Sequence, residues 1–214
     1  MQYSTKLKRA FAGIGITAVL GGSALIGISA ATADQDQTVR PAVSESKPGG
    51  IQSLIQERSA SDSLSAAETE VLKRSAKVGK VSNADYVEAH RNYAKCMAVE
   101  GYKPSFRESS KGYMIELPYE NVDPKGVDIA MSNCSTGTQE VRGLYRLQVA
   151  NPQLLTDSRV VAVKCLQNIG AVDADYSPEQ FERDWNGASY PFDPMVNANN
   201  DCLYDAGYAL FWED

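Results

Sequence analysis

Four cysteines constrain this chain more than any other feature, because three of them stand in the same local frame. Segments 96–102, 165–171 and 202–208 all follow the pattern C-[ML]-x-x-x-G-[YA]. Glycine readily takes the left-handed backbone that ends many helices, and in a Schellman motif a hydrophobic residue before the glycine contacts one just after it. The Met or Leu and the Tyr or Ala of the pattern occupy those two places. Each frame therefore predicts a helix end, with its cysteine in the last turns beside the core.

The N-terminal segment predicts export from the cytoplasm. Lys6, Lys8 and Arg9 precede an uncharged apolar stretch that closes on Ala31-Thr32-Ala33. A basic start, an apolar middle and small residues at the end are typical of a signal peptide, so residues 1–33 are expected to be cleaved after Ala33. The alternative is a retained membrane anchor through residues 11–31, because this stretch is longer than most signal peptides carry. In both cases the positive-inside rule leaves the rest of the chain outside the cytoplasm.

An exported chain with an even number of cysteines is expected to form disulfides. Cys96 and Cys134 are 38 residues apart, and Cys165 and Cys202 are 37 apart. Of the three possible pairings, we favour these two, since linking near neighbours is the simplest solution. The matched spacings also suggest two similar halves. A zinc site is not expected, because zinc sites use C-x-x-C pairs or several histidines, and the chain has one histidine and no such pair.

The remaining pattern predicts an α+β fold that is mainly helical, with a small antiparallel sheet and two disulfides. Residues 34–50 are polar and rich in Pro and Gly, which is typical of a disordered linker. The folded domain is expected over residues 51–214. Capping residues and apolar spacing predict helices at 51–58, 65–78, 82–101, 124–150 with a bend near Gly137 or Gly143, 157–169, 177–185 and 193–206, and strands at 102–107, 113–117 and 208–212.

The charge of the chain argues against two classes of partner. The net charge is −6. Removing residues 1–33 takes away three basic residues and no acidic ones, which leaves 18 basic and 27 acidic residues and a net charge of −9. Proteins that bind nucleic acid or anionic lipid headgroups need clustered Lys and Arg. We therefore expect no nucleic-acid partner, and membrane contact only through residues 11–31 if they are retained.

No motif in the sequence points to catalysis. His90 is the only histidine, and it lies on a predicted helix near tyrosines, where packing is the common role. The chain has no G-x-S-x-G nucleophile motif, no glycine-rich phosphate loop and no dinucleotide fingerprint. We therefore predict no catalytic residue, no metal and no cofactor. Acidic residues such as Glu116, Asp184 and Glu213 keep a secreted hydrolase open as the alternative.

The aromatic residues suggest a binding role. The chain has 11 Tyr, 5 Phe and 2 Trp. Exposed aromatic rings can stack on a sugar or a peptide, whereas buried ones fill a core. The candidates for ligand contact lie near the predicted strands and loops: Tyr102, Tyr113, Tyr119, Trp185, Tyr190 and Trp212.

From Val81 to the C-terminus the chain resembles a group of small exported, lipoprotein-like proteins of actinobacteria, most of them without an assigned function. The resemblance rests on the capped helix start at 82–86, the C-[ML]-x-x-x-G-Y helix end, a hairpin, and a second cysteine-bearing helix with Val141 and Tyr145. Many members of that group carry a lipid-modified cysteine at the end of the signal, where this chain has Ala31-Thr32-Ala33. The resemblance implies export and supplies no catalytic residues.

Together these features favour a secreted or surface-bound protein with a non-enzymatic role. We expect a binding or accessory protein of the cell envelope, whose partner is another envelope protein or a wall component. A hydrolase would show a concave pocket with convergent carboxylates, whereas a binding module would show an exposed aromatic or apolar patch. A purely structural envelope protein would show neither.

Overall fold

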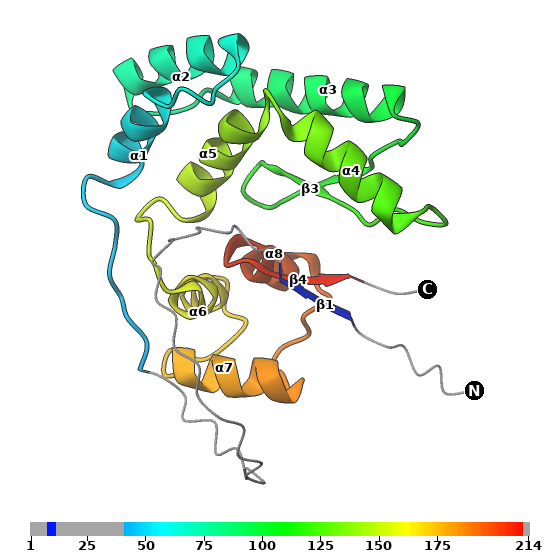
Figure 1. Ribbon diagram of the computed structural model, residues 1–214. Helices are drawn as coiled ribbons and strands as arrows, with labels where there is room; N and C mark the ends of the chain where they lie inside the picture. Colours follow the sequence, from blue (N-terminus) through cyan, green and yellow to red (C-terminus); the bar gives the residue numbers. More distant parts are fainter. Residues whose placement is uncertain (1–7, 12–40, 212–214) are drawn as a thin grey trace, which may run out of the picture.

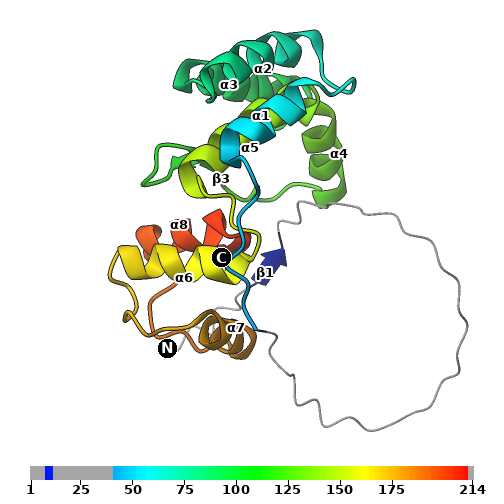
Figure 2. The ribbon, with the colours of Figure 1, turned by 90° about the vertical axis from the view of Figure 1, so that its left-hand side faces the viewer.

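The structure is a computed structural model and describes residues 8–11 and 41–211 (Figure 1). The fold is mainly helical and has two lobes, one above the other in Figures 1 and 2. The first lobe contains α1 (Gly50–Ser59), α2 (Ala66–Val78), α3 (Asn83–Val99), the hairpin β2 (Phe106–Glu108) and β3 (Met114–Glu116), α4 (Pro124–Ser135) and α5 (Gln139–Ala150). The second contains α6 (Ser158–Asn168), α7 (Pro178–Gly187), α8 (Asn197–Asp205) and β4 (Tyr208–Phe211).

Most helices begin where the capping residues predict. Ser65 and Ser177 each form a full capping box, in which the serine accepts a backbone N–H and the side chain three residues later accepts the serine's own N–H. Ser82, Asp123 and Asp157 cap α3, α4 and α6 through single side chains. These caps are local features, which is why the sequence predicts them well.

The predicted Schellman ends are also present. Tyr102 N–H donates to the carbonyl of Met97 at 2.8 Å, and Gly101 N–H donates to that of Ala98 at 3.2 Å, with Gly101 at a φ of 90°. The second frame repeats both bonds: Ala171 N–H donates to the carbonyl of Leu166 at 2.9 Å, and Gly170 N–H donates to that of Gln167 at 3.0 Å. In the third frame Gly207, at a φ of 84°, donates to Tyr204 at 3.1 Å. The glycine thus ends a helix in all three frames.

Two helices differ from the prediction. The expected helix over 124–150 is two helices, because Gly137 takes a φ of 86° and turns the chain between α4 and α5. The last helix begins at Asn197 and not at 193. There Asp193 forms a separate turn, in which its carbonyl accepts from Val196 N–H at 3.3 Å and its side chain accepts from Met195 N–H at 2.9 Å.

Both predicted disulfides are confirmed. Cys96–Cys134 joins the last turns of α3 and α4, with 5.5 Å between the Cα atoms. Cys165–Cys202 joins α6 to α8, with 5.4 Å between the Cα atoms. Each lobe therefore contains one cross-link between two of its own helices. The disulfides indicate an oxidising environment for folding.

The strands form two separate pairs. β2 and β3 make the predicted antiparallel hairpin. The third predicted strand, β4, does not extend that hairpin but pairs antiparallel with β1 (Lys8–Phe11), so that Lys8 faces Phe211 in the register. β1 lies inside the expected signal segment, and the rest of that segment, 1–7 and 12–33, is outside the described residues.

Residues 41–49, part of the expected linker, run along the second lobe before α1 begins (Figure 2). Their backbone pairs with the segment just before α6: Lys47 N–H donates to Leu154 at 3.1 Å, and Thr156 N–H donates to Glu45 at 3.0 Å. Val43 N–H donates to Asp157 at 3.1 Å. This part of the linker is held by tertiary backbone pairing, which composition does not reveal. Residues 34–40 lie outside the described part of the chain.

Three apolar clusters fill the two lobes. The largest packs α1, α2, α3, α5 and the hairpin around Leu72, Tyr86 and Ile115. A second fills the space between α6, α7 and α8 around Leu166, Phe181 and Leu203. A small third cluster surrounds the disulfide between α3 and α4.

The lobes meet where the tip of the β2–β3 hairpin contacts α8. Arg107 pairs with Asp201 at 2.6 Å, and Ser110 N–H donates to the same carboxylate at 2.7 Å. Lys111 pairs with Asp205 at 2.6 Å, and the Tyr113 hydroxyl donates to that carboxylate. The two aspartate side chains are only 3% and 0% exposed. A buried ionic junction therefore fixes the second lobe to the first.

Candidate functional site

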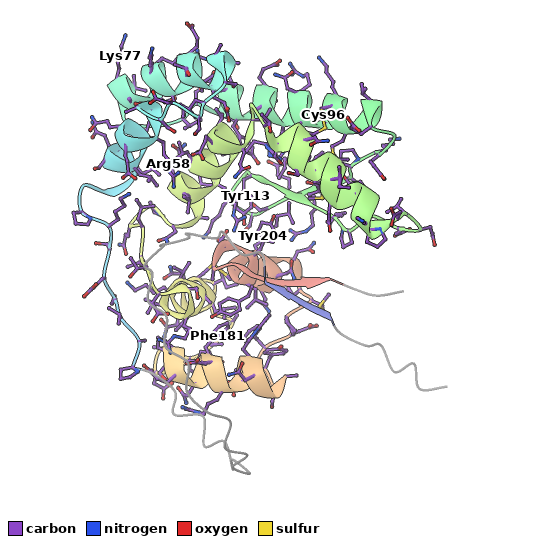
Figure 3. All side chains as sticks on the ribbon, in the orientation of Figure 1. Arg58, Lys77, Cys96, Tyr113, Phe181 and Tyr204 are labelled. Atoms are coloured by element: carbon purple, nitrogen blue, oxygen red, sulfur yellow. A yellow bond between two sulfur atoms is a disulfide. The ribbon has the colours of Figure 1, made fainter. Side chains whose placement is uncertain are left out.

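A cavity of about 300 Å³ lies among the helices of the first lobe, opens at the surface and reaches the second lobe at Tyr204. Residues of α1, α3, β3 and α5 line it, and Tyr204 of α8 completes it from the second lobe. Arg58 on α1 and Tyr204 on α8 are labelled in Figure 3. We call this cavity the arginine pocket, and its lining is Leu54, Arg58, Tyr86, His90, Met114, Glu116, Gln139, Glu140, Arg142, Gly143, Leu144, Arg146, Leu147 and Tyr204.

Arg142 is the most unusual residue of the pocket. Its guanidinium lies over the Tyr93 ring, 3.9 Å from the centroid, and its Nη2 donates to Ser135 Oγ at 3.3 Å. Its Nε is buried and has no hydrogen-bond acceptor among the described residues. Burial lowers the pKa of Arg142, an effect that Tyr93 and Glu116 partly offset. An arginine nevertheless stays charged, so Arg142 is a half-buried cation with no carboxylate within ion-pair distance among the described residues.

The other two arginines are better satisfied. Arg146 lies one turn further along α5, with its guanidinium 4.4 Å from the centroid of the Tyr204 ring and its Nη2 donating to the Tyr204 carbonyl at 2.9 Å. Arg58 approaches Glu140 at 3.7 Å, and that pair is partly exposed. Within residues 41–211 no carboxylate oxygen lies within 4.0 Å of the guanidinium of Arg142 or Arg146. The pocket thus has more positive charge than its own carboxylates neutralise.

His90 lies beside Arg142 and is uncharged near neutral pH. Its ring meets Tyr86 and Phe106 edge-on, at centroid distances of 4.6 Å and 5.3 Å. Burial, with a further contribution from Arg142, lowers the pKa of His90 to about 4. Its Nδ1 is buried and lacks a partner in the part of the chain that the structure describes. His90 can therefore offer a neutral ring nitrogen to a ligand, but not a positive charge.

Glu116 lies at the edge of the pocket with both of its oxygens in use. The Tyr93 hydroxyl donates to both oxygens at 2.9 Å, and the Tyr119 hydroxyl donates to Oε1 at 2.6 Å. Burial and the nearby carboxylate raise the pKa of both tyrosines, so they remain donors. Glu116 is therefore occupied as an acceptor and is held away from Arg142.

Gly143 is an exposed residue on the wall of the pocket. It lies in the middle of α5, between Arg142 and Leu144, and a Cβ added there would meet no other atom within 4 Å. Glycine in a helix interior costs up to about 1 kcal/mol of stability relative to alanine. A side chain at this position would therefore enter open space beside the cavity.

The predicted ligand-contact aromatics lie elsewhere. Tyr113 of the β2–β3 hairpin is completely buried beside Tyr204 (Figure 3), and Trp185 is 4% exposed in the core of the second lobe. Tyr190 packs against that same core, and Tyr102 and Tyr119 pack edge-on beside the α3–α4 disulfide. Trp212 lies outside the described residues. None of the five described rings lines the arginine pocket. Their surroundings are formed by helices distant in the sequence, so local pattern did not reveal them.

Of the acids considered for hydrolysis, only Glu116 reaches this pocket. Asp184 accepts from the Tyr176 hydroxyl at 2.7 Å in the second lobe, and Glu213 lies outside the described residues. The second carboxylate of the pocket, Glu140, is one that sequence reasoning did not select. It pairs with Arg58 and does not converge with Glu116 on a common partner.

Sequence reasoning also missed the arginines themselves. Arg142 and Arg146 stand at i and i+4 around a glycine on one apolar helix, and like charges at that spacing repel each other. This spacing of two like charges was the one feature of the sequence that could have indicated a site for an anion. Arg58 and Tyr204 could not be added to it, since they come from helices far along the chain.

A second cavity of about 530 Å³ lies between α5 and α6, lined by Lys111, Lys164 and the chain from 149 to 153. Lys111 donates there to Ala150 O at 3.3 Å and to Asp205 at 2.6 Å, so its charge is already neutralised. The arginine pocket is therefore the stronger candidate for a ligand site.

Across residues 8–11 and 41–211 no cluster of three or more His, Cys, Asp or Glu side chains is arranged to hold a metal ion. None of the helices described here has the length and apolar character needed to cross a bilayer. Comparison with protein-family models, curated proteins and solved structures found no match.

Proposed function

We propose that this protein is an extracytoplasmic, non-enzymatic binding or accessory protein of the cell envelope, and that it holds its ligand in the arginine pocket. The single observation that carries the proposal is the half-buried Arg142 side chain, which lines a cavity and has no carboxylate partner within the described chain. Burying an unpaired charge is costly, so a site that keeps one gains stability when a ligand supplies the opposite charge.

The rest of the chain supports a role outside the cytoplasm. The signal-like residues 1–33 predict export, and the two disulfides suit an oxidising compartment. The wall or a neighbouring envelope protein is the proposed source of the ligand, since the net negative charge disfavours nucleic acid and anionic lipid surfaces.

A binding role suits the pocket better than hydrolysis does. Hydrolysis by acidic residues needs two carboxylates that converge on one bond. Here Glu116 is engaged by two tyrosine hydroxyls and Glu140 pairs with Arg58. Neither carboxylate has a geometry that favours proton transfer to a common ligand.

Ligand-observed NMR tests the binding proposal with a mixture of small fluorinated acids, amides and amines. The variant Gly143→Leu places a large side chain on the pocket wall, and Gly187→Leu is its matched control on α7, where an added Cβ also meets nothing within 4 Å. We expect compounds that bind the wild type and Gly187→Leu, lose binding to Gly143→Leu, and are recovered unchanged. The same binders for all three proteins, or no binders at all, would contradict the proposal, and turnover of a bound compound would favour the hydrolase.

The location is tested by intact mass of the protein exported by a bacterial host, with and without reductant. We expect a chain beginning at Asp34 that is lighter by four hydrogens than its reduced form. A folded protein kept in the cytoplasm with four free thiols would contradict the extracytoplasmic assignment.

A further inference from the structure

We infer that the arginine pocket selects a monoanionic carboxylate carried on a small apolar body. This inference rests on the proposed binding function and names the ligand class of the same site. Three features of the pocket support it: its charge balance, the free hydrogen-bonding atoms at its polar end, and the apolar character of its remaining walls.

The charge balance fits one negative charge. The lining contains three arginines and two glutamates, and its histidine is neutral near pH 7, so the pocket has a net charge of +1. A single carboxylate neutralises this excess. A phosphate dianion would add a second negative charge beside Glu116 and Glu140, and like charges in a partly buried site repel strongly.

The free hydrogen-bonding atoms are those of Arg142 and His90. Arg142 Nε and His90 Nδ1 have almost no accessible surface and no partner within the described residues, while both side chains line the cavity. A guanidinium presents paired N–H groups that match the two oxygens of a carboxylate, and such charge-assisted bonds are among the strongest in proteins. Arg146, one turn along α5, adds a second positive charge on the same side of the pocket.

The other walls are apolar and the space is small. Leucine, methionine and tyrosine side chains form them: Leu54, Tyr86, Met114, Leu144, Leu147 and Tyr204. The cavity of about 300 Å³ lies at the lower end of small-molecule sites, which span roughly 300–1,000 Å³. One ring with a short chain, or a short aliphatic chain, suits this volume.

The test compares 3-phenylpropionate with its neutral amide and with inorganic phosphate, by calorimetric titration of the full disulfide-bonded protein. Hydrogen bonds to a charged group contribute more than neutral ones, so we expect the acid to bind roughly 10- to 100-fold more tightly than the amide. Phosphate is expected to bind more weakly than the acid. Raising the salt concentration is expected to weaken acid binding only modestly, because the charges are partly buried.

Two test substitutions and one control locate the effect. Arg142→Gln is expected to reduce the preference for the acid over the amide to near unity, whereas Arg91→Gln, an exposed arginine on α3, is expected to leave it unchanged. Circular dichroism checks that both variants are folded. Since Gly143→Leu blocks the cavity and leaves Arg142 in place, it serves as a second variant, and we expect it to lose both compounds.

The outcomes separate the inference from the function that it extends. Equal binding of acid and amide, tighter binding of phosphate, or full retention of the acid preference in Arg142→Gln would overturn the carboxylate assignment. If other compounds of the fluorinated mixture still bind in a manner that depends on Gly143, the binding function remains. If the wild type binds neither these probes nor that mixture, both proposals fail.

Discussion

Replacing Asp205 by asparagine is the most direct test of how the two lobes are joined. The Asp205 side chain is completely buried, pairs with Lys111 at 2.6 Å and accepts from the Tyr113 hydroxyl. Asparagine keeps the shape of the side chain but removes its charge. Its amide nitrogen is a hydrogen-bond donor and would face Lys111 Nζ or the Tyr113 hydroxyl, which are donors too. The variant therefore leaves Lys111 without its counter-charge at the lobe junction.

The substitution exchanges one atom but is expected to lower the free energy of unfolding substantially. Breaking a buried ion pair by removing one partner costs about 3–5 kcal/mol. Lys111 is 31% exposed, so water replaces part of the lost interaction, and we expect the lower end, about 3 kcal/mol. For a chain of this size each kcal/mol lowers the unfolding midpoint by roughly 2–4 °C, which gives a decrease of roughly 6–12 °C.

Urea and thermal unfolding of the oxidised protein measure this loss. Glu88→Gln is the control, because its pair with Arg91 is more than half exposed on both sides and should contribute under about 1 kcal/mol. In a double-mutant cycle, Lys111→Met should cost much less in the Asp205→Asn background than in the wild type. A loss below about 1 kcal/mol, or additive effects of the two substitutions, would refute the reasoning.

Three other predictions follow from the same structure. Replacing both cysteines of either disulfide by serine should cost about 4 kcal/mol in urea unfolding. The cost should be nearly the same for both, because their sequence separations of 38 and 37 residues differ by one, and a loss under about 1 kcal/mol would contradict this. The only histidine, His90, should titrate by NMR with a midpoint about 4, below its ordinary value. Its contribution to stability is therefore present above about pH 6.5 and is lost as the pH falls towards 4. An NMR midpoint above about 6 would contradict the buried site. Gly101→Ala should destabilise the protein by about 1–2 kcal/mol, because the backbone of Gly101 is left-handed. Gly143→Ala should stabilise it by up to about 1 kcal/mol, because alanine favours a helix interior and meets no other atom there. Thermal melts in which the two variants shift in the same direction would contradict these backbone assignments.

Local features account for what could be predicted. The capping box at Ser65, the glycine at 101 and the cysteine spacings act over a few residues or one loop, so the sequence indicates them directly. The boundary between α4 and α5 was harder to predict from the sequence. Both Gly137 and Gly143 could have bent the expected helix, and only packing decided that 137 turns the chain while 143 stays helical.

The sequence by itself determined the helical character of the chain and where most helices begin and end, because those properties depend on neighbours along the backbone. It favoured one of the three cysteine pairings, and the packing of the helices selected that pairing. Only the tertiary structure decided what the side chains face. Tyr113 and Trp185 became core residues, and Arg58, Arg142 and Tyr204 met around one cavity from three helices in two lobes. No local pattern specifies such a meeting, since the charge excess of the pocket exists only after the helices have packed together.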